Sequence, residues 1–372
     1  MSRLTLICAL ALALSSPAAA QDLAISAGQL VVDAEKGSVK GGVLLIRGGK
    51  VVSAGANVKL PAGTKLLKRP GAWIVPGFVD ARAHLGLERD IDERSQAFAN
   101  DIDLADRVVP GHKDFAKHRA AGITTALISP GDQSLLAGAA VPVKTTGALL
   151  GTQRVAKLSL TSSASMNGRP PTSQGGRLAL LRATLKKAHA TKGGGPLEAF
   201  ARGDVPGLVS VSNFTSLEAL QRLAPRFGLR LIYDLQASVS PRTVKGVDLK
   251  GVFLAIGPGR VEFGQAARQV PAVLNKAGAK VLFTSRAPYG PASGMRLRAI
   301  QAAKDGLSGA AALAGLTSIP AQALGLEGRV GALTPGADGD FVVFSGPPLD
   351  LRSRVLEVYV AGRRVYRADG EE

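Results

Sequence analysis

The strongest constraint on the fold is an alternation of short apolar runs with longer helical patterns between residues 76 and 325. The runs are rich in β-branched residues, as expected of strands buried on both faces. An intervening pattern, Ser216 to Phe227, repeats leucines near helical spacing, with Ser216 as a possible N-cap. Such strand-helix units over about 250 residues predict an α/β fold with parallel strands, most simply a TIM-like (β/α)8 barrel. The apolar runs are residues 122–128, 207–212, 229–234, 252–256 and 281–285.

Both ends of the chain have a different pattern of short strands and turns. Residues 22–72 contain strand-like runs separated by polar or Gly-containing breaks, with Gly48-Gly49 as an expected hairpin turn. After residue 325 the pattern returns, and a closing hairpin is expected through Ala361-Gly362. We therefore expect a composite β-sandwich domain built from both chain ends. The predicted divisions are a signal peptide at 1–20, β-sandwich parts at 21–72 and 326–372, and a barrel at 73–325.

The first twenty residues resemble a secretory signal peptide. Arg3 precedes an apolar stretch from Leu4 to Leu14, and Ala18-Ala19-Ala20 offers the small residues of a cleavage site before Gln21. The apolar stretch is too short for a membrane span, so we expect no transmembrane segment and a periplasmic or secreted bacterial protein. The single cysteine, Cys8, lies inside this signal. The mature chain would therefore have no disulfide, thiolate nucleophile or cysteine zinc site.

The chain is strongly basic, with 46 Lys and Arg against 28 Asp and Glu and a net charge of +18. Removing the signal takes away only Arg3, so the mature charge is +17. This surplus favours contact with an anionic envelope surface, although scattered basic residues also suit a merely solubilising surface. Nucleic acid is not an expected partner, because aromatic residues make up 4% of the chain and no binding module is recognisable.

The stretch from Trp73 to Gly86 can be read as a buried strand whose far end presents side chains to a site. Ile74, Val75, Phe78 and Val79 supply strand-forming bulk, and a Pro-Gly pair precedes Phe78 as a break suited to a strand entrance. We therefore expect the residues that follow this strand to belong to the functional site.

Three motifs in order make the chain resemble the amidohydrolase superfamily, nearest to its imidazolonepropionase-like and dipeptidase-like members. One is Val75 to Ala81 and another is Ala121 to Thr125 with Pro130-Gly131. The third is Leu316 to Leu326 followed by Arg329 to Asp340. The resemblance implies a TIM-like barrel that hydrolyses its substrate at a centre of one or two divalent metal ions.

The same resemblance implies the positions of the metal ligands at the C-terminal mouth of the barrel. The family uses a His-x-His pair on the first strand, a carboxylated Lys or a Glu on the fourth, His on the fifth and sixth, and an Asp on the eighth. Here the first-strand pair is Arg82-Ala83-His84, and the fifth, sixth and eighth positions correspond to Ser210, Asp234 and Arg286. His84 is the only retained ligand position, so we expect no metal, or zinc if the protein is active.

The fourth-strand ligand has no clear position, and Lys144 and Glu198 are candidates. The remaining histidines lack ligand spacing, so we expect surface or packing roles for them. They are His112, His118 and His189.

Two arginines at former ligand positions suggest a different site. Arg82 and Arg286 can place two positive charges at the barrel mouth and bind a carboxylate or phosphate. Alternatively, each can pair internally with Asp80 or Asp234. The candidate pocket consists of Arg82, His84, Ser210, Asp234 and Arg286.

Three functions follow from these observations. The first is an exported amidohydrolase-like protein without a metal and catalytically impaired, which binds a small anionic ligand or assists an active homologue. The second is an active hydrolase of C–N bonds, dipeptide-like or not. The third is a basic structural protein of the envelope.

Overall fold

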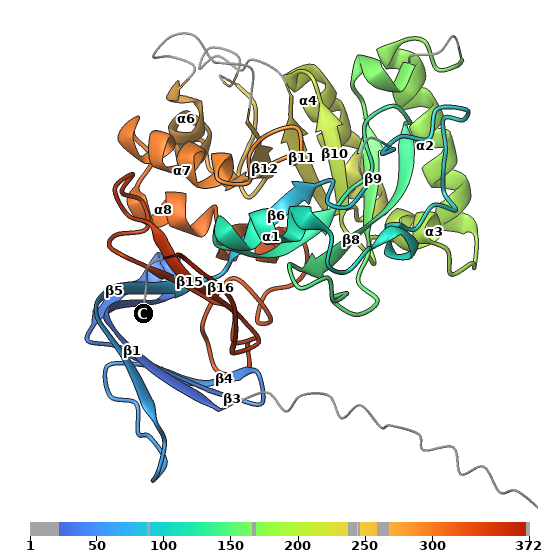
Figure 1. The fold of residues 1–372 in the computed structure, drawn as a ribbon. Coiled ribbons are helices and arrows are strands. Elements are labelled where there is room, and N and C mark those ends of the chain that lie inside the picture. Colours follow the sequence, from blue (N-terminus) through green and yellow to red (C-terminus); the bar gives the residue numbers. More distant parts are fainter. Residues whose placement is uncertain are drawn as a thin grey trace, which may run out of the picture.

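The computed structural model describes residues 22–87, 90–165, 169–236, 244, 246–258 and 268–369 (Figure 1). Its strands form two eight-stranded sheets, one a nearly closed barrel and the other a second sheet domain. The predicted α/β fold class is therefore confirmed. The predicted signal peptide lies outside the described residues. Within the described part of the chain, no helix combines the length and hydropathy needed to cross a bilayer.

The barrel sheet runs in chain order from β6 to β13. Two backbone hydrogen bonds connect the end of its first strand with the residues that follow its last strand. They run from the His84 amide to the Ala287 carbonyl (2.7 Å) and from the Arg286 amide to the Arg82 carbonyl (3.1 Å). The strands are β6 (Phe78–Ala83), β7 (Ile123–Ile128), β8 (Leu136–Lys144), β9 (Val155–Ser159), β10 (Gly207–Val211), β11 (Leu231–Leu235), β12 (Phe253–Ile256) and β13 (Lys280–Phe283).

The expectation of uniformly parallel barrel strands is wrong for one strand. β8 pairs antiparallel with both β7 and β9, while the other neighbouring strands are parallel. A return strand of this kind needs no crossover helix, so no helical pattern separates β7 from β9 in the sequence. β8 is also rich in Ala and contains Gly138 and Pro142, which gives it little of the bulk typical of strands.

The second sheet joins the two ends of the chain, in the order β16-β15-β14-β5-β1-β3-β4, with β2 paired to β1. Its central contacts are β5 parallel to β1 and antiparallel to β14. The closing hairpin is confirmed, with positive φ at Ala361 (49°) and Gly362 (71°) in its turn. The strands are β1 (Leu23–Asp33), β2 (Gly37–Lys40), β3 (Val43–Arg47), β4 (Lys50–Gly55), β5 (Leu66–Pro76), β14 (Phe341–Phe344), β15 (Val355–Val360) and β16 (Arg363–Arg367).

The stretch from Trp73 to Gly86 is not one strand, as the sequence suggested, but parts of two. Residues 73–76 end β5 in the second sheet, where they pair with β14, and the barrel strand begins at Phe78. Gly77 lies between them, and a Cβ at this position would lie 2.1 Å from Thr124 Oγ1. The glycine thus lets the chain pass close to β7 as it crosses from one sheet to the other.

Helices cover the outside of the barrel, with α2 and α4 on one side and α6 and α7 on another (Figure 1). The helix predicted from Ser216 begins two residues earlier, because Asn213 caps it and accepts a hydrogen bond from the Ser216 amide at 2.8 Å. The helices are α1 (Lys113–Ala120), α2 (Gln174–Ala190), α3 (Pro196–Ala201), α4 (Phe214–Leu223), α6 (Val270–Lys276), α7 (Gly294–Lys304), α8 (Gly309–Ala314) and α9 (Ser318–Ala323), with short 3-10 turns at η1 (Ala34–Lys36), η2 (Leu104–Arg107), η3 (Ser162–Ser165) and η4 (Ala224–Phe227).

Candidate site at the barrel mouth

Arg82 lies in the middle of the site, near the end of β6. Its guanidinium donates through Nη1 to Ser210 Oγ at 3.0 Å and to Asp234, and through Nη2 to Asp132 Oδ2 at 2.7 Å. Ser210 and Asp234 are register partners on β10 and β11, so their side chains share a face of the sheet. Arg82 is 2% exposed. Its guanidinium is held by groups from three separate parts of the chain.

Arg286 reaches the same carboxylate from the far end of the barrel sheet. Its Nη2 donates to Asp234 Oδ1 at 2.5 Å and to the carbonyl of Leu235 at 2.9 Å. The residue has a φ of 48°, a left-handed conformation that is strained for a long side chain. The two arginines expected at the mouth therefore share Asp234. The sequence left open that each arginine pairs internally with Asp80 or Asp234. In the described structure Asp234 is the partner of both, and Asp80 pairs with neither guanidinium.

Lys157 belongs to the same cluster, although the sequence patterns did not single it out. It lies on β9, which is the fourth strand of the barrel sheet. Its Nζ donates to Asp132 Oδ1 at 2.6 Å, to Ser210 Oγ at 3.0 Å and to the carbonyl of Leu158 at 2.8 Å. The side chain is fully buried, and this burial lowers the pKa of Lys157 to about 8.

The fourth-strand candidates proposed from the sequence are therefore wrong. Lys144 ends β8 and forms ion pairs of 2.6 Å with Asp338 and Asp340, far along the chain. Glu198 belongs to helix α3, not to a strand. On the fourth strand itself, Lys157 is the side chain that joins the cluster.

Asp132 follows β7 in a loop and bridges two of the cations. Burial by itself would raise the pKa of Asp132, but the charges of Arg82 and Lys157 outweigh it and hold the pKa well below its usual range. Gln236 Nε2 also donates to its Oδ2, at 2.5 Å. Three cationic side chains and two carboxylates thus form direct ion pairs in the cluster. The charge of Asp92 also acts on Arg82 and Lys157 and offsets the third cation.

His84 lies beside this cluster and is neutral at pH 7. Burial, and to a smaller extent the charge of Arg82, lower the pKa of His84 to about 4. Its Nδ1 is 2.6 Å from the carbonyl of Ser129, so Nδ1 carries the proton and donates it. The ring also packs edge-on against Tyr289, with centroids 5.6 Å apart. No hydrogen bond joins His84 to the other four predicted pocket residues in the described structure.

A second layer of polar groups supports the backbone of Arg82 and of Ser285, the residue before Arg286. Asp80 accepts hydrogen bonds from the amides of Arg82 and Ser285, each at 3.1 Å, and from the Ser285 hydroxyl. His118 Nε2 lies 3.4 Å from Ser285 Oγ and 3.5 Å from Asp80 Oδ2. His118 is 1% exposed, so its place is in the packing behind the site.

The two other histidines lie away from the mouth cluster. His112 caps α1, and His189 Nδ1 lies 2.9 Å from the carbonyl of Ala201. Neither histidine contacts the cluster in the described structure.

The side chains at the mouth do not fit a divalent metal. A guanidinium cannot coordinate a cation, and Arg82 and Arg286 both contact the one carboxylate, Asp234, that stands at a ligand position. Among the described residues, no group of three or more His, Cys, Asp and Glu side chains is arranged to hold a metal ion. The charged side chains at the mouth of this barrel thus pair with one another.

Comparisons with known proteins agree with the fold. The amidohydrolase family model matches residues 279–366. An amidohydrolase from Thermotoga maritima MSB8 has a similar structure, with a TM-score of 0.82 and 23% identity over 93% of this chain and 100% of that one. Two other solved structures are less similar. Molinate hydrolase has a TM-score of 0.58 and 15% identity over 93% of this chain and 95% of that one. A putative prolidase from Bifidobacterium longum has a TM-score of 0.57 and 15% identity over 95% of this chain and 97% of that one.

No curated protein matches the sequence. The resemblance to the amidohydrolase superfamily is nevertheless confirmed, since the chain has the fold of these proteins and matches the amidohydrolase family over residues 279–366.

Proposed function

We propose that this protein is a metal-independent member of the amidohydrolase fold that binds a small anionic ligand at the barrel mouth. The observation that carries the proposal is that the buried Nε–H groups of Arg82 and Arg286, which converge on Asp234, find no acceptor within the described structure. The protein replaces a bound cation with fixed guanidinium groups, which suits binding better than metal-assisted hydrolysis.

The unpaired Nε–H groups of Arg82 and Arg286 support an anion as the ligand. Buried donors of this kind normally have an acceptor, and a carboxylate supplies acceptors that match the geometry of a guanidinium.

A thermal-shift screen of small carboxylates against their neutral amides tests this proposal. We expect a carboxylate to raise the melting temperature of the wild type by a few degrees at a concentration well above its Kd. Arg286→Gln should lose the shift, because its side chain is 18% exposed and can reach a ligand. Arg352→Gln, which alters an arginine 90% exposed and paired with Asp350, is the matched control and should keep it. Equal shifts in wild type and Arg286→Gln, or none with any carboxylate, would contradict the proposal.

A second candidate is hydrolysis of C–N bonds without a metal, and Lys157 favours it. With a pKa of about 8, a fraction of this lysine is an uncharged amine near neutral pH and can accept a proton. A screen of dipeptides and amides with wild type and Lys157→Met separates the two candidates. Turnover that persists after exhaustive chelation and is lost in Lys157→Met would favour hydrolysis over binding alone.

We also propose that the protein is exported and begins at Gln21 after cleavage, because residues 1–20 have the pattern of a signal peptide. N-terminal sequencing of protein from the periplasm tests this. Recovery of the full-length chain in the cytoplasm alone would contradict it.

A further inference from the structure

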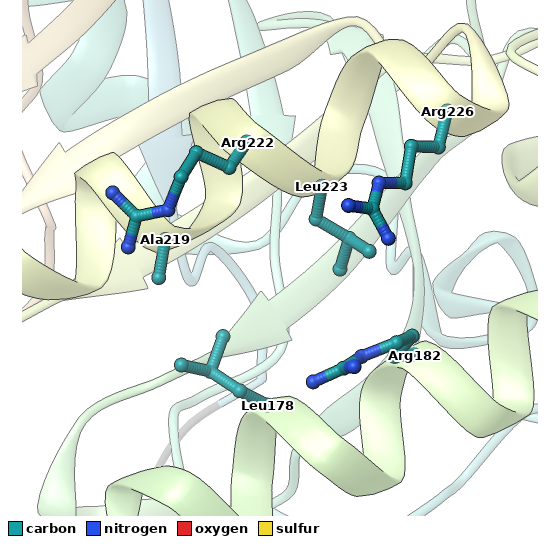
Figure 2. Close-up of a pocket in the computed structure, with 6 residues that line it drawn as sticks. All are labelled: Leu178, Arg182, Ala219, Arg222, Leu223 and Arg226. Atoms are coloured by element: carbon teal, nitrogen blue, oxygen red, sulfur yellow. The ribbon is translucent and has the colours of Figure 1, made fainter.

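A groove on the outside of the barrel lies between α2 and the continuous segment of α4 and η4. Its volume is about 270 Å³, and side chains from both helices point into it (Figure 2). The residues that line it are Leu178, Arg182, Ala219, Arg222, Leu223 and Arg226.

Each wall of this groove combines apolar and cationic side chains. Leu178 and Arg182 are four residues apart on α2, and Arg222 and Arg226 are four apart on the opposite wall, so each pair shares one helix face. Leu223 is buried between the two arginines of its wall, whereas all three arginines are exposed. The groove therefore has an apolar base and a cationic rim.

The three arginines are not neutralised by the protein. Within the described residues, no carboxylate forms an ion pair or hydrogen bond with Arg182, Arg222 or Arg226, unlike the arginines at the barrel mouth. Helix α2 contains no acidic residue. Glu218, the one acid of α4, lines a neighbouring cavity with Arg222 but is not paired with it. Three like charges around a small space repel one another, and an anion between them removes that repulsion.

The groove suits one anionic group with a short apolar substituent. Arginine forks match the oxygens of a phosphate, and three of them can surround a doubly charged group. The apolar base can pack against the carbon atoms attached to that phosphate. The volume of about 270 Å³ is below the range of roughly 300–1,000 Å³ that holds drug-sized ligands. We propose that Arg182, Arg222 and Arg226 form a binding site for a phosphate monoester, separate from the barrel mouth.

Calorimetric titration with phenyl phosphate at constant ionic strength tests this site. We expect binding to wild type, a loss of about fivefold for each single Arg→Gln change, and no measurable binding in the Arg182→Gln, Arg222→Gln, Arg226→Gln triple variant. Arg363→Gln is the matched control, because Arg363 is exposed on β16 and its side chain forms no ion pair with a described residue. Arg363→Gln should bind normally. The triple variant should keep the thermal shift with carboxylates, which separates this site from the mouth. Equal binding in wild type and triple variant, or none in wild type, would overturn the proposal.

A vesicle experiment distinguishes a soluble ester from a lipid head group. Sedimentation with vesicles of phosphatidic acid in phosphatidylcholine, lost in the triple variant, would identify the lipid as the source. If the protein binds phenyl phosphate but does not sediment with the vesicles, the ligand is a soluble ester. Sedimentation that the triple variant retains, without phenyl phosphate binding, would mean that general positive charge, not this groove, attracts the anion.

Discussion

Lys157 Nζ lies 2.6 Å from Asp132 Oδ1 in an interior where the lysine has no exposed surface. This pair joins the fourth barrel strand, β9, to the loop that follows the second strand, β7. Through Asp132 the lysine is linked to Arg82, and through Asp234 Arg82 is linked to Arg286. A single connected network of charges thus spans the mouth of the barrel.

The burial of Lys157 predicts that stability rises at high pH. Its pKa is about 8 in the folded protein and about 10.5 when unfolded, so the unfolded chain binds more protons between these values. Unfolding free energy should therefore increase, by about 3 kcal/mol at most, as pH rises from 8 to 10.5. In Lys157→Met this rise should be absent. Urea denaturation of both proteins across this range measures it, and parallel pH curves would show that the lysine is not desolvated.

His84 predicts a loss of stability at the acidic end of the pH range. Its pKa is about 4 in the folded state against 6.5 as the ordinary value, so folding excludes a proton that the unfolded chain takes up. Stability should fall as pH drops from 6.5 to 4, by about 3 kcal/mol at most. Replacement by Gln keeps a donor for the Ser129 carbonyl and removes the titration. Between pH 7 and pH 5, the unfolding free energy should then fall less in His84→Gln than in the wild type, as measured by chemical denaturation. An equal fall in both proteins would mean that another group causes the loss of stability in acid.

Removal of the shared carboxylate should damage the fold more than removal of a surface one. Asp234→Asn leaves Arg82 and Arg286 without their common partner in a buried site, and we expect a loss of about 3–5 kcal/mol. Asp204→Asn is the control, because its pair with Arg202 is largely exposed and is expected to contribute about 1 kcal/mol or less. Chemical denaturation at pH 7 compares them. Similar losses in the two variants would mean that the mouth network is not a structural element.

The sequence predicted the part of the fold that depends on strong strand patterns. β7 and β10 to β13 each contain β-branched or aromatic bulk, and all were expected. β8 and β9 were missed. The Ala-rich run of β8 resembles neither a strand nor an amphipathic helix, and β9 is a run of five residues interrupted by Lys157. The Pro-Gly break before Phe78 marked the entrance of the barrel strand. That residues 73–76 belong to the second sheet depends on their pairing with β14, which no local pattern shows.

The site was predictable only where a motif marked the strand ends. Arg82, Ser210, Asp234 and Arg286 were placed by the resemblance, and the structure brings these four together. Lys157 was missed because it sits in the five-residue strand Val155–Ser159, where a lysine among apolar residues suggests a solvated face. Asp132 was missed because it lies in a loop, and loop side chains have no period that fixes their direction.

Restoring the expected ligands should create a metal site. In the family that this chain resembles, the corresponding positions carry His on the first, fifth and sixth strands and Asp on the eighth. The variant that combines Arg82→His, Ser210→His, Asp234→His and Arg286→Asp, with Lys157 unchanged, should bind zinc with at least one ion per chain. Arg82→His alone should not, since two histidines are fewer than the usual three or four ligands. A folded fourfold variant without zinc affinity would show that the backbone no longer supports the site.

Metal analysis of the wild-type protein shows whether the barrel mouth holds a metal ion. The chain, produced in medium supplemented with zinc, manganese and nickel and purified without chelators, is measured by plasma mass spectrometry. Because two guanidinium groups occupy the mouth and share Asp234, we expect each metal well below one ion per chain. One or two ions per chain, lost when His84 is replaced, would contradict the account and restore a metal centre to the barrel.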